Sequence, residues 1–308
     1  MEFRNTQMGK PLKVLITGAT GFVGTTLLRH LISLRNYEIC CLARNISRLP
    51  QEVKAIDCSV AGWNEKVIEW HPEVVIHLAA HFTGRSQFAD IPNLVQSNIT
   101  FTAEIAETVT HCSDFKLFIN SGTFTEFADG AGIPRPNNLY SATKAAVRPI
   151  LQYYCEKGGW KWANVIIYSP YGRRNSKKKV IDYLCDALES PVPVSFSPGE
   201  QILDFIHVDD MADFFSTLIS KNDRVPQGFT QWHLGTGQGH TLREVAAIME
   251  EISGRKVNAV WGGRDYNPED PMYAVAPQAN NINSLDWSSK ISLRKGLEIY
   301  LKERNIIQ

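Results

Sequence analysis

The chain has 308 residues, 44% of them hydrophobic, which is enough for one large domain or two linked domains around a sizeable core. Lys+Arg and Asp+Glu both number 32, so no overall charge favours nucleic acid or an acidic membrane as a partner. No apolar run reaches the roughly 18 residues that span a bilayer. Residues 1–10 are polar and lack the apolar core of a signal peptide, so we expect a flexible arm there. The six cysteines have no C-x-x-C spacing, which favours free buried thiols in a reducing cytoplasm.

A strand and a helix joined by three glycines come first along the chain. Residues 14–16 form an apolar, mostly β-branched run typical of a buried parallel strand, and apolar residues in 27–34 recur at helical spacing. Between them, Gly18 suits a sharp turn, Gly21 lets a pyrophosphate approach the backbone, and Gly24 lets the helix pack closely. The alternative is a glycine-rich turn without a ligand. We predict that the cofactor contacts Thr17, Gly18, Gly21, Phe22, Val23 and Gly24.

The second predicted strand, residues 37–43, ends at Arg44. An acidic side chain at this place would bind the adenosine 2′-hydroxyl of NAD, whereas an arginine suits the 2′-phosphate of NADP. We therefore predict NADP(H) in preference to NAD(H), with an ordinary surface arginine as the alternative. Asp57 follows a further short strand and is a candidate to accept a hydrogen bond from the adenine amine, although a solvated loop acid fits equally well.

Tyr140 and Lys144 are the candidate proton-transfer pair. They are four residues apart in an alanine-rich helical segment, so they share one face of the helix. A nearby ammonium lowers the pKa of a tyrosine, and the phenol can then give a proton to a carbonyl oxygen as hydride reaches the carbon. Lys144 can also hold the ribose hydroxyls, so Tyr140 and Lys144 are predicted cofactor contacts as well. Ser121 and Thr123 follow the predicted strand 116–119, at the edge where ligands bind. We predict that Thr123 holds the substrate oxygen and that Ser121 lines the cofactor; ordinary turn chemistry is the alternative.

Taken together, these segments resemble the extended short-chain dehydrogenase/reductase superfamily, and in it the NDP-sugar epimerase/dehydratase group. The resemblance covers nearly the whole chain. Its motifs are GATGFVG at 18–24, His77-Leu-Ala-Ala80, Asn98, Ser121–Thr123, Tyr140/Lys144, Ser169-Pro-Tyr-Gly172, Asp204–Asp210 and Leu285-Asp-Trp287. The resemblance implies a Ser/Thr–Tyr–Lys triad, here Thr123, Tyr140 and Lys144. It also implies that Leu78, Ala79, Ala80 and Tyr168 contact the cofactor.

The fold class that we expect is α/β, a doubly wound Rossmann sheet with a smaller C-terminal substrate lobe. Residues 11–168 would form the dinucleotide-binding domain, and 201–237 would return to it. Residues 169–200 and 238–308 would form the nucleotide-sugar lobe. The helices around 98–110 and 140–156 are expected to pair across a homodimer, as in relatives, although burial against the chain's own sheet would give the same pattern.

Departures from the family pattern narrow the reaction. Family 4,6-dehydratases carry Asp-Glu directly after the catalytic Thr, where this chain has Phe124-Thr125. Epimerases usually hold NAD through an acid after the second strand, where this chain has Arg44. The remaining interpretation is an NADPH-dependent 4-ketoreductase acting on an NDP-4-keto-6-deoxyhexose in deoxysugar biosynthesis, like the CDP-abequose, CDP-paratose and dTDP-fucose synthases. The alternatives are an NAD-dependent 4-epimerase and a non-catalytic NADP(H)-binding regulator, and neither the base nor the C4 configuration follows from the sequence.

The substrate contacts are less regular than in the family. Leu203 replaces an arginine that relatives use for the diphosphate, and Ser169 replaces a common asparagine. The basic run 173–179 is a candidate source of the missing charge, with a solvated face as the alternative. His77 and His81 are spaced as in a zinc helix but pass from a strand into a loop, so we predict no metal site. The expected substrate-binding residues are His81, Thr123, Phe124, Ser169, Arg173 and Arg264, and Arg85 is expected beside His81.

Overall fold

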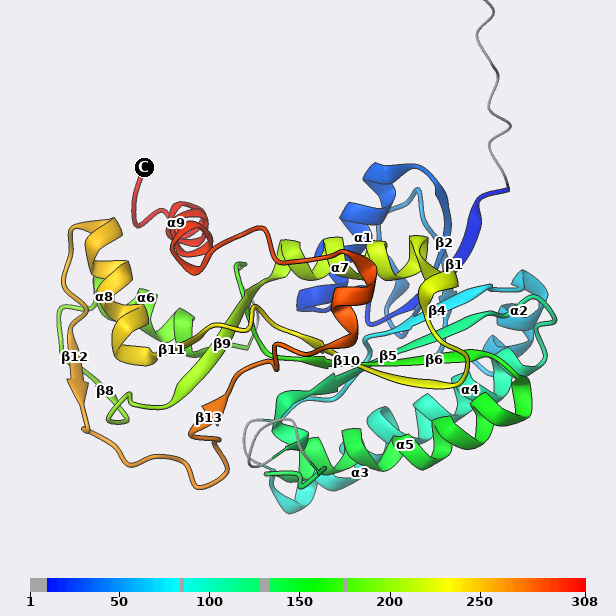
Figure 1. Cartoon of the computed structure of the whole chain (residues 1–308), viewed down its shortest axis with the longest axis horizontal. Helices are drawn as coiled ribbons and strands as arrows, with labels where there is room; N and C mark the ends of the chain where they lie inside the picture. The colour runs from blue at the N-terminus through cyan, green and yellow to red at the C-terminus, as the bar shows by residue number, and fades with distance from the viewer. Residues whose placement is uncertain (1–9, 84–85, 128–132, 174–176) are drawn as a thin grey trace, which may run out of the picture.

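A parallel sheet forms the centre of the larger lobe (Figure 1). The computed structural model describes residues 10–83, 86–127, 133–173 and 177–308. The sheet has seven strands in the order β10-β6-β5-β4-β1-β2-β3. Their bounds are β1 (Leu12–Thr17), β2 (Tyr37–Ala43), β3 (Lys54–Asp57), β4 (Val74–His77), β5 (Leu117–Thr123), β6 (Lys161–Ile167) and β10 (Phe229–Leu234). Every neighbouring pair is parallel, which confirms the predicted doubly wound α/β fold.

Helices cover both faces of this sheet (Figure 1). On one face lie α1 (Phe22–Leu34) and α7 (Val208–Ser220), which pack against each other. The other face carries α2 (Trp63–Trp70), α4 (Phe101–Thr110) and α5 (Leu139–Gly158), and α4 continues α3 (Ile91–Val95) through a π-helical turn, Gln96–Thr100. Each face of the sheet carries its own apolar core. Val14 and Ile16 pack into the core beneath α1 and α7, and Leu15 packs into the core on the opposite face, because successive strand residues point to opposite faces. A strand buried on both faces must be apolar throughout, which is why β1 reads as a continuous apolar run.

The turn between β1 and α1 has the shape that its glycines predict. Gly18 has φ +70°, in the left-handed region that favours glycine, and a Cβ there would lie 2.6 Å from the backbone nitrogen of Ala79. A Cβ on Gly24 would overlap the carbonyl oxygen of Gly18. Gly18 therefore allows the turn, and Gly24 allows α1 to begin against it.

The smaller lobe is built around a second sheet. In this sheet β9 (Ile202–His207) pairs with β7 (Ser169–Tyr171), β11 (Gly239–Thr241) and β13 (Tyr273–Ala274). A separate two-stranded sheet is formed by β8 (Val194–Phe196) and β12 (Ala259–Trp261). The helices α6 (Val180–Glu189), α8 (Leu242–Ser253) and α9 (Leu293–Glu303) complete a separate apolar core. Thus β9 is an exception to the expectation that 201–237 returns to the main sheet, whereas α7 and β10 lie in the Rossmann layers. Leu285 and Trp287, assigned by sequence to the substrate lobe, pack into the Rossmann core instead, where the indole N–H donates to Asp213 (2.7 Å).

All six cysteines are free thiols; Cys58 is half-buried and the others are buried. In the part of the chain that the structure describes, no helix is both long and apolar enough to cross a membrane. The predicted arm falls, apart from Lys10, outside the described residues.

We expect Gly18→Ala to destabilise the fold more than Gly254→Ala does. Both glycines have a positive φ, but nothing lies within 4 Å of a Cβ at Gly254, so this control measures backbone strain alone. Strain costs about 1 kcal/mol at either site, and the clash at Gly18 adds about 1–3 kcal/mol. Urea unfolding of the two variants checks this. Equal losses in unfolding free energy would show that the turn relaxes around the new methyl group.

Candidate active site

A line of hydrogen bonds orders the crevice between β1 and β4, where the winding of the sheet reverses. The hydroxyl of Thr102 donates to the carbonyl of Asn98 (2.8 Å), so it accepts from the ring N–H at Nε2 of His77 (2.9 Å). In the neutral ring Nδ1 then accepts from the hydroxyl of Thr17 (2.8 Å), which itself accepts from the backbone N–H of Ala79 (3.1 Å). Burial, aided by the charge of Lys144, lowers the pKa of His77 to about 3, so the ring is neutral. His77 therefore ties two strands and a helix together, and the side chain of Thr17 is committed to protein partners.

The start of α1 can hold a phosphate. Gly21 is exposed and caps the helix without a side-chain bond, and no acidic residue lies in the first turn. The free N–H groups of the helix end, at Phe22 and Val23, thus face outward in a positive field. Gly18 packs directly on the backbone of Leu78 and Ala79, while Ala80 is exposed beyond them.

Arg44 and Asp57 lie side by side at the ends of neighbouring strands. Arg44 is exposed directly after β2, and Ala43 is in register with Asp57 on β3. One oxygen of the Asp57 carboxylate accepts from the backbone N–H (2.8 Å) and the hydroxyl (2.6 Å) of Ser59, and these bonds lower its pKa. Both predicted adenosine contacts therefore lie at the same edge as the glycine turn, with Arg44 free to meet an anion.

Strand β5 and helix α5 bring the predicted reacting residues together. Lys144 is 2% exposed, and its ammonium lies 3.5 Å from the hydroxyl of Ser121, which itself donates to the carbonyl of His77 (3.0 Å). Asn138 starts α5 with a capping box, since its side chain accepts from the backbone N–H of Ser141 (2.9 Å). The cap fixes where α5 begins and so orients Tyr140, two residues into the helix.

The electrostatics of Tyr140 run opposite to the sequence-based expectation. Burial raises the pKa of Tyr140, and the charge of Glu126 raises it further, so the phenol is neutral at pH 7. Burial lowers the pKa of Lys144 to about 8, while Glu126 acts in the opposite direction. The predicted lowering of the tyrosine pKa by Lys144 is therefore wrong for the groups of this chain, because desolvation of the phenolate dominates. A neutral phenol is the form that donates a proton.

Aromatic rings and one histidine wall the site. Phe82 meets the ring of Tyr140 edge-on at 5.0 Å, and Phe124 stacks on Tyr168 at 5.9 Å with 18° between the planes. The side chain of Asn98 binds both the backbone N–H (2.7 Å) and the carbonyl (3.1 Å) of His81. Nε2 of His81 is buried and has no hydrogen-bond partner among the described residues, which suits a substrate contact.

The substrate lobe contributes charge unevenly. Ser169 begins β7 beside Tyr168, and Arg173 pairs with Asp209 (3.1 Å). Arg264 is exposed, and its backbone N–H donates to the carbonyl of Phe196 (3.2 Å). Arg85, expected beside His81, lies outside the described residues. Tyr168, the neighbour of Ser169, stacks on Phe124, which follows Thr123. The roles of Ser169 and of the two arginines stay predictions.

Two lysines of the basic run reach across to the Rossmann lobe. Lys177 donates to the carbonyl of Phe82, and Lys179 donates to the carbonyl of Pro170 (3.1 Å) with its ammonium 4.2 Å from the ring centre of Phe22. Lys178, by contrast, points away and pairs with Asp186 (2.6 Å). The described part of the run is therefore not uniformly a solvated face. Residues 174–176 of the run lie outside the described residues.

Sequence reasoning missed the residues that support the site from behind. Glu126 and Arg148 form a buried ion pair (2.7 Å) directly below the reacting residues. Arg148 stands four positions after Lys144, so the helical repeat that linked Tyr140 to Lys144 could have revealed it. Glu126 gives no such signal, because a single acid after a strand is ordinarily a loop residue.

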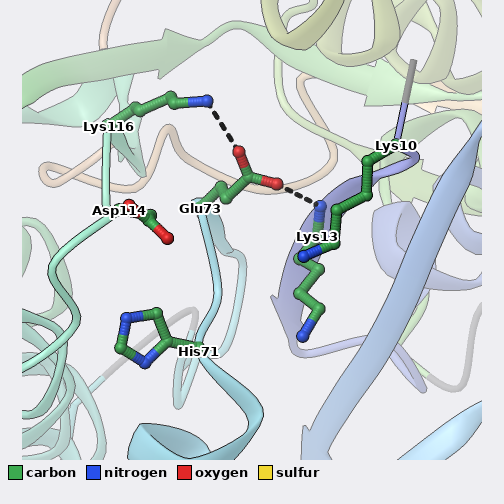
Figure 2. A pocket seen from close by; sticks show the side chains of 6 residues that line it. All are labelled: Lys10, Lys13, His71, Glu73, Asp114 and Lys116. Atoms are coloured by element: carbon green, nitrogen blue, oxygen red, sulfur yellow. Dashed lines mark hydrogen bonds and ion pairs between the residues drawn. The ribbon is translucent and has the colours of Figure 1, made fainter.

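A cavity of about 310 Å³ lies at the other end of the sheet (Figure 2). Glu73, just before β4, accepts from the ammonium of Lys116 (2.6 Å) and from the backbone N–H of Lys13 (3.1 Å), and Lys10, His71 and Asp114 complete the lining. These residues stand at the amino ends of β1, β4 and β5, opposite the predicted reacting residues. Glu73 therefore joins strand starts, and the cavity is not the active site.

Relatives carry the same fold and family pattern. CDP-abequose synthase of Yersinia pseudotuberculosis is 28% identical over 262 residues, 84% of this chain and 90% of that protein. A putative UDP-glucose 4-epimerase of Methanocaldococcus jannaschii is 25% identical, with 92% of this chain and 96% of that protein covered. The solved UDP-glucuronic acid 4-epimerase of Bacillus cereus, in complex with UDP-glucuronic acid and NAD, shares the fold with a TM-score of 0.85 at 21% identity, over 96% of this chain and 99% of that chain.

The family pattern itself runs from β1 to the end of β10. The profile of the NAD dependent epimerase/dehydratase family matches residues 14–234, which include the glycine turn, Ser121, Thr123, Tyr140 and Lys144. This span is most of the chain and all of the main sheet. The chain therefore belongs to the NAD dependent epimerase/dehydratase family, which is a family of enzymes.

Proposed function

We propose that this chain is an NADPH-dependent reductase of the C4 keto group of a CDP- or dTDP-linked 4-keto-6-deoxyhexose. One observation carries the choice of reaction. The first acid after Thr123 is Glu126, which is fully buried and bound to Arg148 (2.7 Å). Glu126 is therefore not available for the acid–base catalysis that elimination of water requires. The relative named CDP-abequose synthase supports the substrate class.

The chain's own residues supply the proton and hold the sugar. A bound reduced dinucleotide would supply the hydride. Tyr140 gives its phenolic proton to the oxygen on C4, and the hydroxyl of Thr123 hydrogen-bonds that oxygen. Lys144 stabilises the resulting tyrosinate by its charge until solvent returns the proton. The neutral phenol that burial enforces on Tyr140 is the starting form that reduction needs.

Lys179 supports cofactor binding from the second lobe. Its ammonium lies above the ring of Phe22, the first residue of α1, and donates a hydrogen bond to the carbonyl of Pro170. Burial lowers the pKa of Lys179 to about 8, so the charge is costly and gains from an anion. We place the pyrophosphate of the dinucleotide between this lysine and the N–H groups of α1.

The homodimer is also a proposal. Tyr153 on α5 is 58% exposed and Val95 at the end of α3 is 40% exposed, on the layer that covers one face of the sheet. Apolar side chains left in water on adjacent helices favour pairing of two copies through that layer.

Tyr140→Phe is expected to lower NADPH oxidation about 10²–10⁴-fold, because the proton donor is lost while the ring remains. The assay follows NADPH absorbance with CDP- and dTDP-4-keto-6-deoxyglucose, and dinucleotide affinity should stay unchanged. A variant as active as the parent would contradict the role of Tyr140. If the parent oxidises NADPH with neither sugar and copurifies with NAD, the 4-epimerase is the better interpretation. Biological function without hydride transfer would favour the regulator.

Arg44→Ala should weaken NADPH binding about tenfold and leave NADH binding unchanged, because only NADPH carries the 2′-phosphate. Arg48→Ala is the matched control, since Arg48 is also an exposed arginine just after β2. Fluorescence titration with each dinucleotide measures both. Equal losses for the two dinucleotides would remove the basis for NADP preference.

Lys179→Met should weaken NADPH binding about tenfold in the absence of any sugar. Lys178→Met is the control, because the neighbouring lysine pairs with Asp186 and points away. Unchanged NADPH affinity in Lys179→Met would mean that this lysine does not hold the dinucleotide.

A further inference from the structure

A fully buried carboxylate lies immediately behind the reacting residues. Glu126 is 0% exposed and ends the short 3-10 helix η4 (Phe124–Glu126) that follows β5. One of its oxygens accepts from the backbone N–H of Thr123 (2.8 Å). The other oxygen accepts from Nε (3.0 Å) and Nη2 (2.7 Å) of Arg148. Glu126 therefore joins the residue proposed to hold the substrate oxygen to the helix that carries Tyr140.

Arg148 shares one helical face with the proposed proton-transfer pair. It stands four residues after Lys144 and eight after Tyr140 on α5. Its guanidinium is only 17% exposed and also donates to the amide oxygen of Gln231 (2.9 Å) on β10. The charge of Glu126 thus has a fixed place, because a forked pair of hydrogen bonds and a backbone N–H hold both oxygens.

The polar chain continues to a wall of the site. The amide nitrogen of Gln231 donates to Nε2 of His233 (2.9 Å), so the proton of the ring sits on Nδ1, which contacts the hydroxyl of Tyr168 (3.1 Å). Burial, with the charge of Arg148, lowers the pKa of His233 to about 4 and keeps the ring neutral. This series of hydrogen-bonded residues therefore runs from Thr123 to Tyr168. It contains one negative charge, on Glu126, and one positive charge, on Arg148.

A buried ion pair at this place needs a reason beyond stability. Packing two apolar side chains is often as stable as burying an ion pair, since both ions lose their hydration. Glu126 acts on both reacting groups: its charge raises the pKa of Tyr140 and opposes the burial that lowers the pKa of Lys144. Among the described residues, the titratable groups around Glu126 and Lys144 are Arg148 and Tyr140 on α5, His233 on β10, Tyr168 after β6, His77 on β4, and Arg135, whose backbone N–H donates to the carbonyl of Glu126 (2.8 Å).

We propose that Glu126, held by Arg148 and bound to the backbone N–H of Thr123, is a positioning residue whose buried charge favours the ammonium form of Lys144. A charged Lys144 stabilises the tyrosinate that remains once Tyr140 has donated its proton to a ketone. The same carboxylate fixes the backbone of Thr123 next to the substrate oxygen. This inference rests on the proposed reductase activity for its consequence, but its premise concerns only the chain's own ionisable groups.

Titration of Lys144 in Glu126→Gln tests the inference without a substrate. Glutamine keeps an oxygen for the N–H of Thr123 and removes the charge. We expect the pKa of Lys144 to fall by roughly one unit from about 8, because a nearby negative charge no longer favours the ammonium. NMR of protein labelled at the lysine ε-carbon measures it, and Lys144→Arg identifies the resonance. An unchanged Lys144 pKa in a folded Glu126→Gln variant would overturn the inference.

Two further variants separate charge from packing. Glu126→Asp retains the charge and should keep the pKa of Lys144 near that of the parent. Asp182→Asn removes a carboxylate that is also buried, 6% exposed, but lies in the other lobe, and it should not move Lys144. If the single variant unfolds, Glu126→Gln with Arg148→Gln replaces the ion pair by two amides and should lower the Lys144 pKa by a smaller amount, because the loss of the Arg148 charge acts in the opposite direction. A shift in Asp182→Asn as large as that in Glu126→Gln would also contradict the inference.

The pH profile of reduction provides the second readout. In Glu126→Gln the alkaline limb of kcat/KM should move down by roughly one pH unit, so the loss of rate approaches about tenfold above the parent's midpoint and is small below the new one. An equal loss of activity at every pH would assign Glu126 a purely structural role. If the parent reduces none of the keto sugars, the proposed function fails, whereas the Lys144 titration still decides the inference.

Discussion

Parallel pairing of β1 with β4 is the constraint on which the site depends. These two strands meet where the winding of the sheet reverses, which is where open parallel sheets bind ligands, at the carboxyl ends of the strands. Thr17 and His77 lie opposite each other in register at that end and are hydrogen-bonded (2.8 Å). The ring of His77 also contacts Thr102, and its backbone carbonyl accepts from the hydroxyl of Ser121. This one residue therefore aligns the end of β1, a helix and β5.

Burial sets the chemistry more than proximity of charges does. Tyr140 and Lys144 both lose solvent, and desolvation moves each of them toward its neutral form. For the tyrosine this favours the acid, which proton donation needs. For Lys144, desolvation lowers the pKa and so disfavours the ammonium, whereas the buried carboxylate of Glu126 raises the pKa again. The pair Glu126–Arg148 therefore belongs to the same electrostatic unit as Tyr140 and Lys144.

The second lobe reaches the crevice through a few side chains. Lys177 and Lys179 contact Phe82 and Phe22, which stand beside Tyr140 and at the start of α1. Leu285 and Trp287 pack into the Rossmann core from the far end of the chain. The two lobes are thus joined both by apolar burial and by the cations of Lys177 and Lys179.

The sequence by itself determined the elements whose pattern is local. The apolar strand, the three glycines and the four-residue spacing of Tyr140 and Lys144 each record a backbone geometry within a few residues, and β1, α1 and α5 follow them. Gly18 and Gly24 have the close contacts that their positions predicted, because only a glycine fits there.

Only the tertiary structure decided what depends on residues far apart in sequence. The pairing of β9 with β7 and β11, the buried Glu126–Arg148 pair, the inward direction of Lys179 and the raised pKa of Tyr140 all arise from packing between distant segments. From the sequence alone, a single acidic residue or lysine without a motif around it is predicted to be exposed to solvent. Its burial, and therefore its charge state, is fixed only when the helix and the strands around it are assembled, since desolvation depends on every neighbour at once.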